Sequence, residues 1–243
     1  MINIAYDAGH GMYTPGKRCD KRLDPNETRE WFLNNRVANY VERTLLDNYS
    51  GFTFMRLDDR TGQTDVTLKD RVNKANRWGA DVVISVHHNA GAKLTNAGGI
   101  TAHVANVCSS KSKVYQKDLY NSLIKHTGLK GNRSNPLSSN NFYIVRYTNA
   151  PAVLIEHGFM DSLIDTPIIL TDDFARKCAD AHVEFLVNTF KLKEINKTTY
   201  ADDLETLVEH EVIDSPDYWR ECGRTTFHIK ELIANIAKKL RGK

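Results

Sequence analysis

The sequence has few features that would cross-link the chain or anchor it in a membrane. Its 243 residues include only four cysteines, Cys19, Cys108, Cys178 and Cys222. These are far apart and form no C-x-x-C pair, which argues against both a disulfide framework and a cysteine zinc cluster, so we expect free thiols. No apolar run approaches the roughly 20 residues that a membrane-spanning helix needs, and we therefore expect no membrane insertion.

An excess of charge of one sign is also absent. The 33 basic and 30 acidic residues leave a formal net charge of +3. This balance is too even to indicate nucleic acid as a partner, although it is mildly favourable near anionic polymers. The hydrophobic fraction of 41% and the charged fraction of 26% are typical of an ordinary soluble globular protein. Because no secretory signal precedes the first predicted strand, we expect synthesis in the cytoplasm and another way out for any extracellular task.

Apolar runs alternate with segments of helical period, which indicates an α/β fold. The predicted strands are the runs that begin at Ile2, Val82 and Ala152, together with residues 52–57, 99–105 and 142–145. The predicted helices are residues 30–48, 67–78, 112–126 and 172–192. This order predicts a three-layer sandwich, in which helices cover both faces of a twisted, mostly parallel sheet of about six strands. The run 99–105 is a candidate for an antiparallel strand at an edge.

The chain divides into a large domain and a small one. Residues 1–192 carry the alternating pattern, and residues 193–200 form a polar stretch that reads as a linker. Residues 201–243 show apolar stripes that predict two or three short helices, with Pro216 suited to the first position of one of them. So short a segment seldom stands alone, so we expect it to dock on the main domain or to oligomerise.

Polar residues follow two of the apolar runs where a parallel sheet would collect them. His10 lies between Gly9 and Gly11, and the glycines permit the tight turn that lifts an imidazole into a cleft. His87 ends the second run and is followed by His88 and Asn89. In open α/β sheets, reactive groups gather beyond the carboxyl ends of the strands. One histidine alone could equally be a structural residue, but two in this position indicate a metal site.

A third metal ligand is expected from a carboxylate. Catalytic zinc commonly takes three protein ligands, such as two histidines and a glutamate, and leaves one position open. Glu27 and Glu30 are the candidates, and both could instead simply interact with the dipole of the first helix. We favour Glu30, because it immediately precedes the apolar face of that helix, whereas Glu27 lies in a loop-like stretch.

The third run ends in Glu156, His157 and Gly158. A buried glutamate is rare without a partner. Near a zinc-bound water, Glu156 could act as the general base that takes a proton from water and passes it to a leaving amine. Side-chain alternation points His157 to the opposite face of the sheet, where a structural role is expected.

These residues resemble the zinc-dependent N-acetylmuramoyl-L-alanine amidases of the third amidase family, which includes bacterial autolysins and phage endolysins. Five motifs carry the resemblance, in the expected order over residues 1 to 192: residues 7–11 (DAGHG), 29–34 (REWFLN), 68–76 (LKDRVNKAN), 85–90 (SVHHNA) and 155–159 (IEHGF). Five ordered motifs are far more specific than any one of them.

The resemblance implies that His10, Glu30 and His87 hold one zinc ion and that Glu156 is the catalytic glutamate. The implied reaction hydrolyses the amide between N-acetylmuramic acid and L-alanine in peptidoglycan, and so lyses the bacterial cell wall. Asn89 is a candidate substrate-binding residue. His88 is a further one, which we expect in the cleft wall, with a donor role behind the metal ligands as the alternative.

Two other functions fit the same ligand set. A zinc peptidase could use these residues to cut stem peptides, since specificity lies in loops whose shape the sequence does not give. A wall-binding module with an inactive centre is disfavoured, because none of the four residues is missing.

The partner expected for the large domain is peptidoglycan. The C-terminal segment is expected either to bind a secondary wall polymer or to form a homodimer. An enzyme made without a secretory signal would reach the wall after release by a holin or after lysis of the producing cell.

Overall fold

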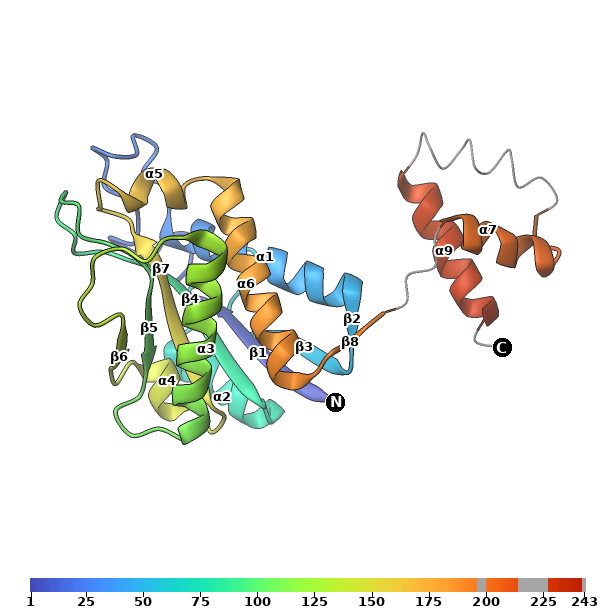
Figure 1. Cartoon of the computed structure of the whole chain (residues 1–243), viewed down its shortest axis with the longest axis horizontal. Helices are drawn as coiled ribbons and strands as arrows, with labels where there is room; N and C mark the ends of the chain where they lie inside the picture. Colours follow the sequence, from blue (N-terminus) through green and yellow to red (C-terminus); the bar gives the residue numbers. More distant parts are fainter. Residues whose placement is uncertain (196–199, 214–226, 242–243) are drawn as a thin grey trace. The chain divides into compact units, whose positions relative to one another are not determined.

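The computed structural model describes residues 1–195, 200–213 and 227–241 (Figure 1). The chain forms two compact units, Met1–Glu194 and Ile195–Lys243. The first carries the predicted α/β pattern and all candidate site residues. Among the described residues, no helix is both long and apolar enough to cross a membrane.

The first unit is built on a six-stranded sheet with the strand order β3-β1-β4-β7-β5-β6. The strands β3, β1, β4 and β7 are mutually parallel, β5 is antiparallel to β7, and β6 is parallel to β5. Their bounds are β1 Ile2–Ala8, β3 Phe52–Arg56, β4 Val82–Asn89, β5 Thr101–Val104, β6 Leu137–Ser139 and β7 Ala152–Phe159. The predicted mostly parallel sheet of about six strands is confirmed.

Helices cover both faces of this sheet, as Figure 1 shows. One face packs against α1 (Glu30–Asn48), α3 (Ser110–Thr127) and α6 (Asp172–Phe190). The other face packs against α2 (Leu68–Trp78) and α4 (Tyr143–Tyr147). The short helix α5 (Asp165–Ile169) follows β7. The strands β2 (Tyr49–Ser50) and β8 (Lys193–Glu194) pair with each other in a separate antiparallel two-stranded sheet. The three-layer arrangement predicted for the chain is therefore present.

Strand alternation separates the side chains into two cores. Tyr6 and Ile155 belong to the core beneath α1, α3 and α6, whereas their neighbours Ala5 and Leu154 belong to the core beneath α2 and α4. This follows from the period of two along a strand, which sends successive side chains to opposite faces. Strands buried on both faces read as continuous apolar runs, which explains the composition of β4 and β7.

Local sequence signals explain where α2 begins and ends. The hydroxyl of Thr67 accepts a hydrogen bond from the backbone N–H of Asp70, and so satisfies one of the free donors of the first turn. The helix ends at Gly79, which has a left-handed backbone with φ of 71°. Glycine adopts this conformation without a steric penalty, so it is well suited to terminate the helix.

The strand order creates a switch point between β1 and β4. The chain moves from β1 to β3 on one side and then crosses to β4 on the other side of β1. Where the order reverses, the loops beyond the carboxyl ends of the two strands diverge and leave a crevice. His10 follows β1 and His87 lies near the end of β4, so both residues stand at this crevice.

Two strand predictions are wrong in part. Residues 142–145 were predicted as a strand, but Tyr143–Tyr147 form α4, with Ile144 and Val145 buried in the core beneath α2. A short apolar run fits either structure, and packing against the sheet decides between them. Residues 99–105 do supply an antiparallel strand, but β5 is not at an edge, because β6 pairs with its outer side.

The buried face of α1 is a single stripe along the helix. Leu33, Val37, Val41 and Leu45 are buried. Leu46 is 55% exposed and lies outside the buried stripe. Only residues three or four apart share a helix face, so two consecutive leucines cannot both be central to it.

The second unit contains α7 (Tyr200–Glu209) and α9 (Phe227–Arg241), which pack against each other. Leu204, Leu207, Ile233 and Ala237 form their buried core. Two helices with a small core agree with the helical pattern of the sequence, whereas Pro216 and Cys222 lie outside the described residues. The other three cysteines are free thiols.

Arg71 ties α2 to the strand end that carries His10. Its side chain is 1% exposed and forms an ion pair with the buried Asp7. The guanidinium also donates to the backbone oxygens of Ala8 at 2.8 Å and His10 at 2.9 Å. The hydroxyl of Ser85 donates to the other oxygen of Asp7 at 2.7 Å. One buried cation therefore fixes the path of the backbone into the crevice.

We expect Arg71→Met to lower the free energy of unfolding by about 3–5 kcal/mol, because it leaves the buried Asp7 carboxylate without its counter-ion. Arg77→Met is the matched control. It lies on the same helix but is exposed, and its effect should stay within about 0.5 kcal/mol. Urea unfolding of the three proteins measures the difference. Equal midpoints would contradict the role assigned to Arg71.

Candidate active site

His10 is held in an unusual backbone conformation at the end of β1. Its φ is 68°, in the left-handed region that residues other than glycine seldom adopt. Such strain persists only where the surroundings enforce it, and it gathers at functional sites. Here the Arg71 guanidinium holds the His10 carbonyl oxygen. The imidazole is thereby directed toward the crevice.

Gly9 allows the two histidines to approach each other. A Cβ atom built at Gly9 would lie 2.0 Å from Cε1 of His87. No residue with a side chain fits at this distance. The centroids of the His10 and His87 rings are 4.9 Å apart, with the rings nearly perpendicular. Gly9 is therefore required for the close approach of the two rings. From the sequence, the glycines beside His10 were expected only to permit a tight turn.

Glu30 reaches the same place from the first turn of α1. Its side chain is 2% exposed. Its backbone N–H donates to the carbonyl oxygen of Lys17 at 3.0 Å, which folds the preceding loop back onto the helix start. Glu27, the alternative considered from the sequence, instead forms an ion pair with Arg18 at 3.1 Å. Of the two carboxylates, only Glu30 contacts the histidines.

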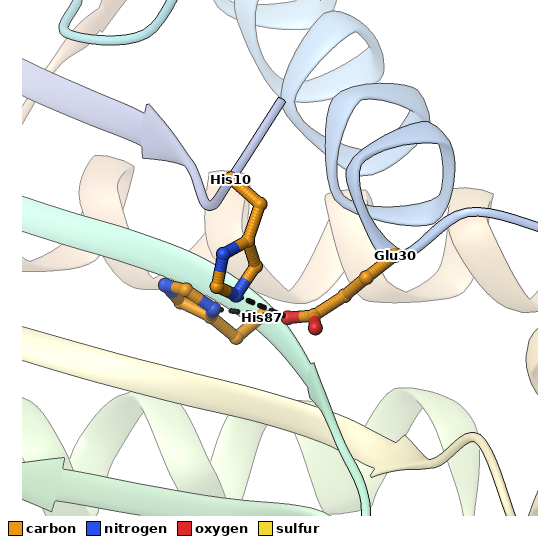
Figure 2. Close-up of side chains that lie close together, drawn as sticks. All are labelled: His10, Glu30 and His87. Carbon is orange, nitrogen blue, oxygen red and sulfur yellow. Dashed lines mark hydrogen bonds and ion pairs between the residues drawn. The ribbon is translucent and has the colours of Figure 1, made fainter. Parts of the chain in front are cut away.

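The three side chains converge on one point, as Figure 2 shows. The Oε1 atom of Glu30 lies 3.0 Å from Nδ1 of His87 and 3.3 Å from Nε2 of His10. One ligand atom from each residue lies within 4.8 Å of the others. Ligands arranged tetrahedrally at about 2.0–2.1 Å from zinc are roughly 3.3 Å apart. The spacing therefore suits a zinc ion after small adjustments.

Two buried polar atoms of this cluster have no hydrogen-bond partner, and a bound metal ion would serve as their partner instead. Nε2 of His10 and Oε2 of Glu30 are buried and have no hydrogen-bond partner. Buried polar atoms are nearly always satisfied in folded proteins, and exceptions need an explanation. Two imidazoles and one carboxylate form a donor set typical of catalytic zinc. The residues present therefore fit a metal.

The electrostatics keep Glu30 ionised. Burial by itself would raise the pKa of its carboxyl, but the close contacts with the imidazoles of His10 and His87 outweigh burial and lower that pKa below its ordinary value. Burial likewise acts to lower the pKa of His87, and its bond to Glu30 outweighs this effect and raises it. An ionised carboxylate is the form that binds a metal cation.

Glu156 lies next to this cluster on the adjacent strand. The β4–β7 register pairs Glu156 with His87. Burial raises the pKa of Glu156 to about 7. Its Oε2 atom is buried and accepts no hydrogen bond. Such an oxygen is available to take a proton, as a general base must.

Two hollows open onto these residues. One of about 190 Å³ is lined by Glu30, Glu156 and Asn89, together with Lys17 from the loop before α1. The other, of about 350 Å³, is lined by His10 and His87, together with Asp65 and Arg71. A hollow of about 440 Å³ between α3 and α6 is lined by none of the candidate site residues.

Asn89 and His88 both line the hollow of about 190 Å³. Asn89 is half-buried, and its Oδ1 accepts from the backbone N–H of Ala90 at 2.8 Å. His88 is 2% exposed, and its Nδ1 lies 2.8 Å from Oδ1 of Asn34. The position of His88 agrees with both roles considered for it, in the cleft wall and behind the metal ligands.

Two further residues were not identified from the sequence. Asn34 is fully buried and donates from Nδ2 to the carbonyl oxygen of Gly9 at 3.1 Å, while its Oδ1 faces His88. Lys17 places Nζ 3.7 Å from Oε2 of Glu30. Asn34 lies four residues after Glu30 and therefore on the same helix face, which is a usable signal. Nothing in the sequence indicates that the loop carrying Lys17 folds over the site.

Comparisons with known proteins show the family to which the chain is related. A family model described as N-acetylmuramoyl-L-alanine amidase matches residues 4–188. The sporulation-specific N-acetylmuramoyl-L-alanine amidase of Bacillus subtilis is 28% identical over 198 residues, which cover 82% of this chain and 72% of that protein. The endolysin of Bacillus phage SPP1 is 28% identical over 194 residues, covering 77% of this chain and 66% of the endolysin.

Solved structures show the same fold. The catalytic domain of CwlV, an N-acetylmuramoyl-L-alanine amidase from Bacillus (Paenibacillus) polymyxa var. colistinus, superposes with a TM-score of 0.69 and 25% sequence identity. The match covers 79% of this chain and 100% of that domain. An N-acetylmuramoyl-L-alanine amidase from Clostridium difficile matches with the same TM-score and identity, over 78% of this chain and 97% of its own.

We expect Gly9→Ala to weaken binding of a divalent metal at least about tenfold, because the new methyl group displaces the His87 ring. The matched control is Gly79→Ala. At Gly79 an added Cβ meets no atom within 4 Å, although φ is positive, so only a generic loss of about 1 kcal/mol in stability is expected. Calorimetric titration with zinc measures both variants. Unchanged affinity in Gly9→Ala would show that the close approach does not matter.

Proposed function

The chain belongs to the N-acetylmuramoyl-L-alanine amidase family and hydrolyses the amide between N-acetylmuramic acid and L-alanine in peptidoglycan, and we propose that it does so with one zinc ion held by His10, Glu30 and His87. The observation that carries this proposal is the convergence of the three ligand atoms within 4.8 Å. The unsatisfied buried atoms Nε2 of His10 and Oε2 of Glu30 support it further.

When bound, zinc polarises a carbonyl oxygen and lowers the pKa of a coordinated water. The protein supplies the proton transfers. Glu156 takes the proton of the attacking water on its free Oε2. The water oxygen bonds to the lactyl carbonyl carbon, the C–N bond breaks, and Glu156 returns the proton to the nitrogen of the departing L-alanine. Reaction of one water with one amide thus yields a carboxylic acid and an amine.

The pocket supports the same division of roles. Asn89 lies in the wall beside Glu156 and offers a side-chain amide to a peptide substrate. The ammonium of Lys17, whose side chain is 44% exposed, lies 3.7 Å from the Glu30 carboxylate. His88, which lines the pocket and lies against Asn34, is assigned to supporting the metal ligands from behind. The family match disfavours the zinc peptidase considered as an alternative.

We expect His10→Ala to lose zinc and activity together, because two remaining ligands hold the ion poorly. Glu156→Gln should keep about one zinc per chain yet lose activity by at least about 10²-fold, since the amide removes the proton acceptor. Metal analysis and release of new L-alanine amines from purified peptidoglycan measure the two properties. Chelation should abolish activity, and added zinc should restore it.

Two results would contradict the proposal. If wild-type protein that contains no metal still cleaves the amide, the proposed zinc site is wrong. If the Glu156→Gln variant is fully active, Glu156 is not the general base, even when zinc is bound.

For the second unit we propose a role in attachment to the cell wall. Residues 195–243 lie outside the match to the family model. A tethered binding unit raises the effective concentration of an enzyme at a polymeric substrate. A secondary wall polymer is the proposed ligand, and a homodimer contact is the other role considered. Release through a holin or by cell lysis stays a prediction.

We expect a protein ending at residue 194 to cleave a soluble muropeptide at the rate of the full chain but to sediment with purified cell walls at least several-fold less. Sedimentation and light scattering separate the two roles. Unchanged wall binding would exclude the attachment role, and a change from dimer to monomer would favour the dimer contact instead.

A further inference from the structure

Three buried polar side chains cross the interior on the face of the sheet opposite Glu156. They are Tyr6 on β1, His157 on β7 and His182 on α6, and each is 0% exposed. We refer to these three residues as the histidine line. Burying such groups costs free energy unless each is hydrogen-bonded. The catalytic steps described above use none of them.

The histidine line ends at the backbone of a proposed zinc ligand. The Tyr6 hydroxyl lies 2.8 Å from Nδ1 of His182, and Nε2 of His182 lies 3.0 Å from Nε2 of His157. Nδ1 of His157 lies 3.2 Å from the carbonyl oxygen of His87. Three consecutive contacts therefore connect the interior to the metal cluster.

The carbonyl oxygen of His87 determines which ring nitrogen carries the proton in each histidine of the line. A carbonyl oxygen only accepts, so His157 must carry its proton on Nδ1. Both rings are 0% exposed, and burial in the interior favours the neutral imidazole over the charged one. Nε2 of His157 then accepts, His182 donates from Nε2, and Nδ1 of His182 accepts from the Tyr6 hydroxyl. Each contact has one donor and one acceptor.

The contact to His87 lies at an irregularity of the sheet. The register between β4 and β7 shifts after the His87–Glu156 pair, so that two steps along β4 oppose three along β7. Gly158, with φ of 101°, lies in the extra step. Such bulges interrupt the regular ladder and re-aim side chains beside active sites. The side chain of His157 bonds to the β4 backbone at this point.

We propose that the histidine line positions His87 relative to Glu156, by holding the His87 backbone across the bulge in a single arrangement. The inference rests on the proposed function, in which these two residues hold the metal and move the proton. His157 directly follows Glu156, so the same backbone segment carries the general base and the hydrogen bond to the metal ligand. His157, His182 and Tyr6 are positioning residues and touch no substrate.

A pair of substitutions at His157 tests the positioning role in the full-length zinc enzyme. His157→Leu removes the donor to the His87 carbonyl. His157→Asn keeps an N–H donor near the position of Nδ1. Loss of groups that orient metal ligands typically costs about 10–100-fold in metal affinity or activity. We expect His157→Leu to lose about tenfold or more in zinc affinity and in kcat with little change in KM, and His157→Asn to regain most of both.

A purely structural role would give a different pattern. Both variants would then lose thermal stability, while the folded protein kept the zinc affinity and kcat of the wild type. That result would overturn the proposal, as would a His157→Asn variant no better than His157→Leu in kcat and zinc affinity.

The protonation pattern can be tested without substitution, metal or substrate. In wild-type protein with ¹⁵N-labelled histidine at pH 7, NMR should find His157 protonated on Nδ1 and His182 protonated on Nε2. The opposite tautomer at either ring would overturn the proposal. Failure of the wild type to bind zinc would refute the proposed metal site, but the tautomers would still be measured. The two failures are therefore distinguishable.

Discussion

The burial of one carboxylate between two imidazoles is the constraint on which the rest of the site depends. Glu30 is 1% exposed, and an isolated carboxylate in that position would be strongly destabilising. Its contacts with His10 and His87 make the burial tolerable and give the cluster a geometry suited to a cation. The close contact of three such groups requires both Gly9, which has no side chain, and the strained backbone of His10.

The supporting structure is arranged on both faces of the sheet. On one face, Arg71 and the buried Asp7 hold the strand end that leads to His10. On the other face, Asn34 holds the carbonyl oxygen of Gly9, and His157 lies against the carbonyl oxygen of His87. Both proposed histidine ligands thus have their local backbone fixed by buried side chains from other elements. Such support is what makes a catalytic geometry reproducible.

Alternation along the strands explains why one short motif can serve two purposes. Glu156 points to the face of α2 and α4, while His157 points to the face of α1 and α6. The carboxylate therefore enters the pocket, and the adjacent imidazole enters the core. Sequence reasoning placed His157 on the opposite face but gave no partner for it. Its partners Tyr6 and His182 are distant in the chain, and only folding brings them together.

The sequence by itself determined the α/β class, the parallel strands with their helices, and the candidate residues His10, Glu30, His87 and Glu156. Periodicity and strand-end position are local properties, so they can be read along the chain. The tertiary structure alone decided that residues 142–145 form part of a helix and that β6 lies outside β5.

It also decided how the loop before α1 places Lys17 beside Glu30, and how Tyr6, His182 and His157 meet. These features depend on contacts between residues far apart in the chain. Such contacts have no periodic signature, because the free energy that selects them comes from burial and hydrogen bonding in the assembled core.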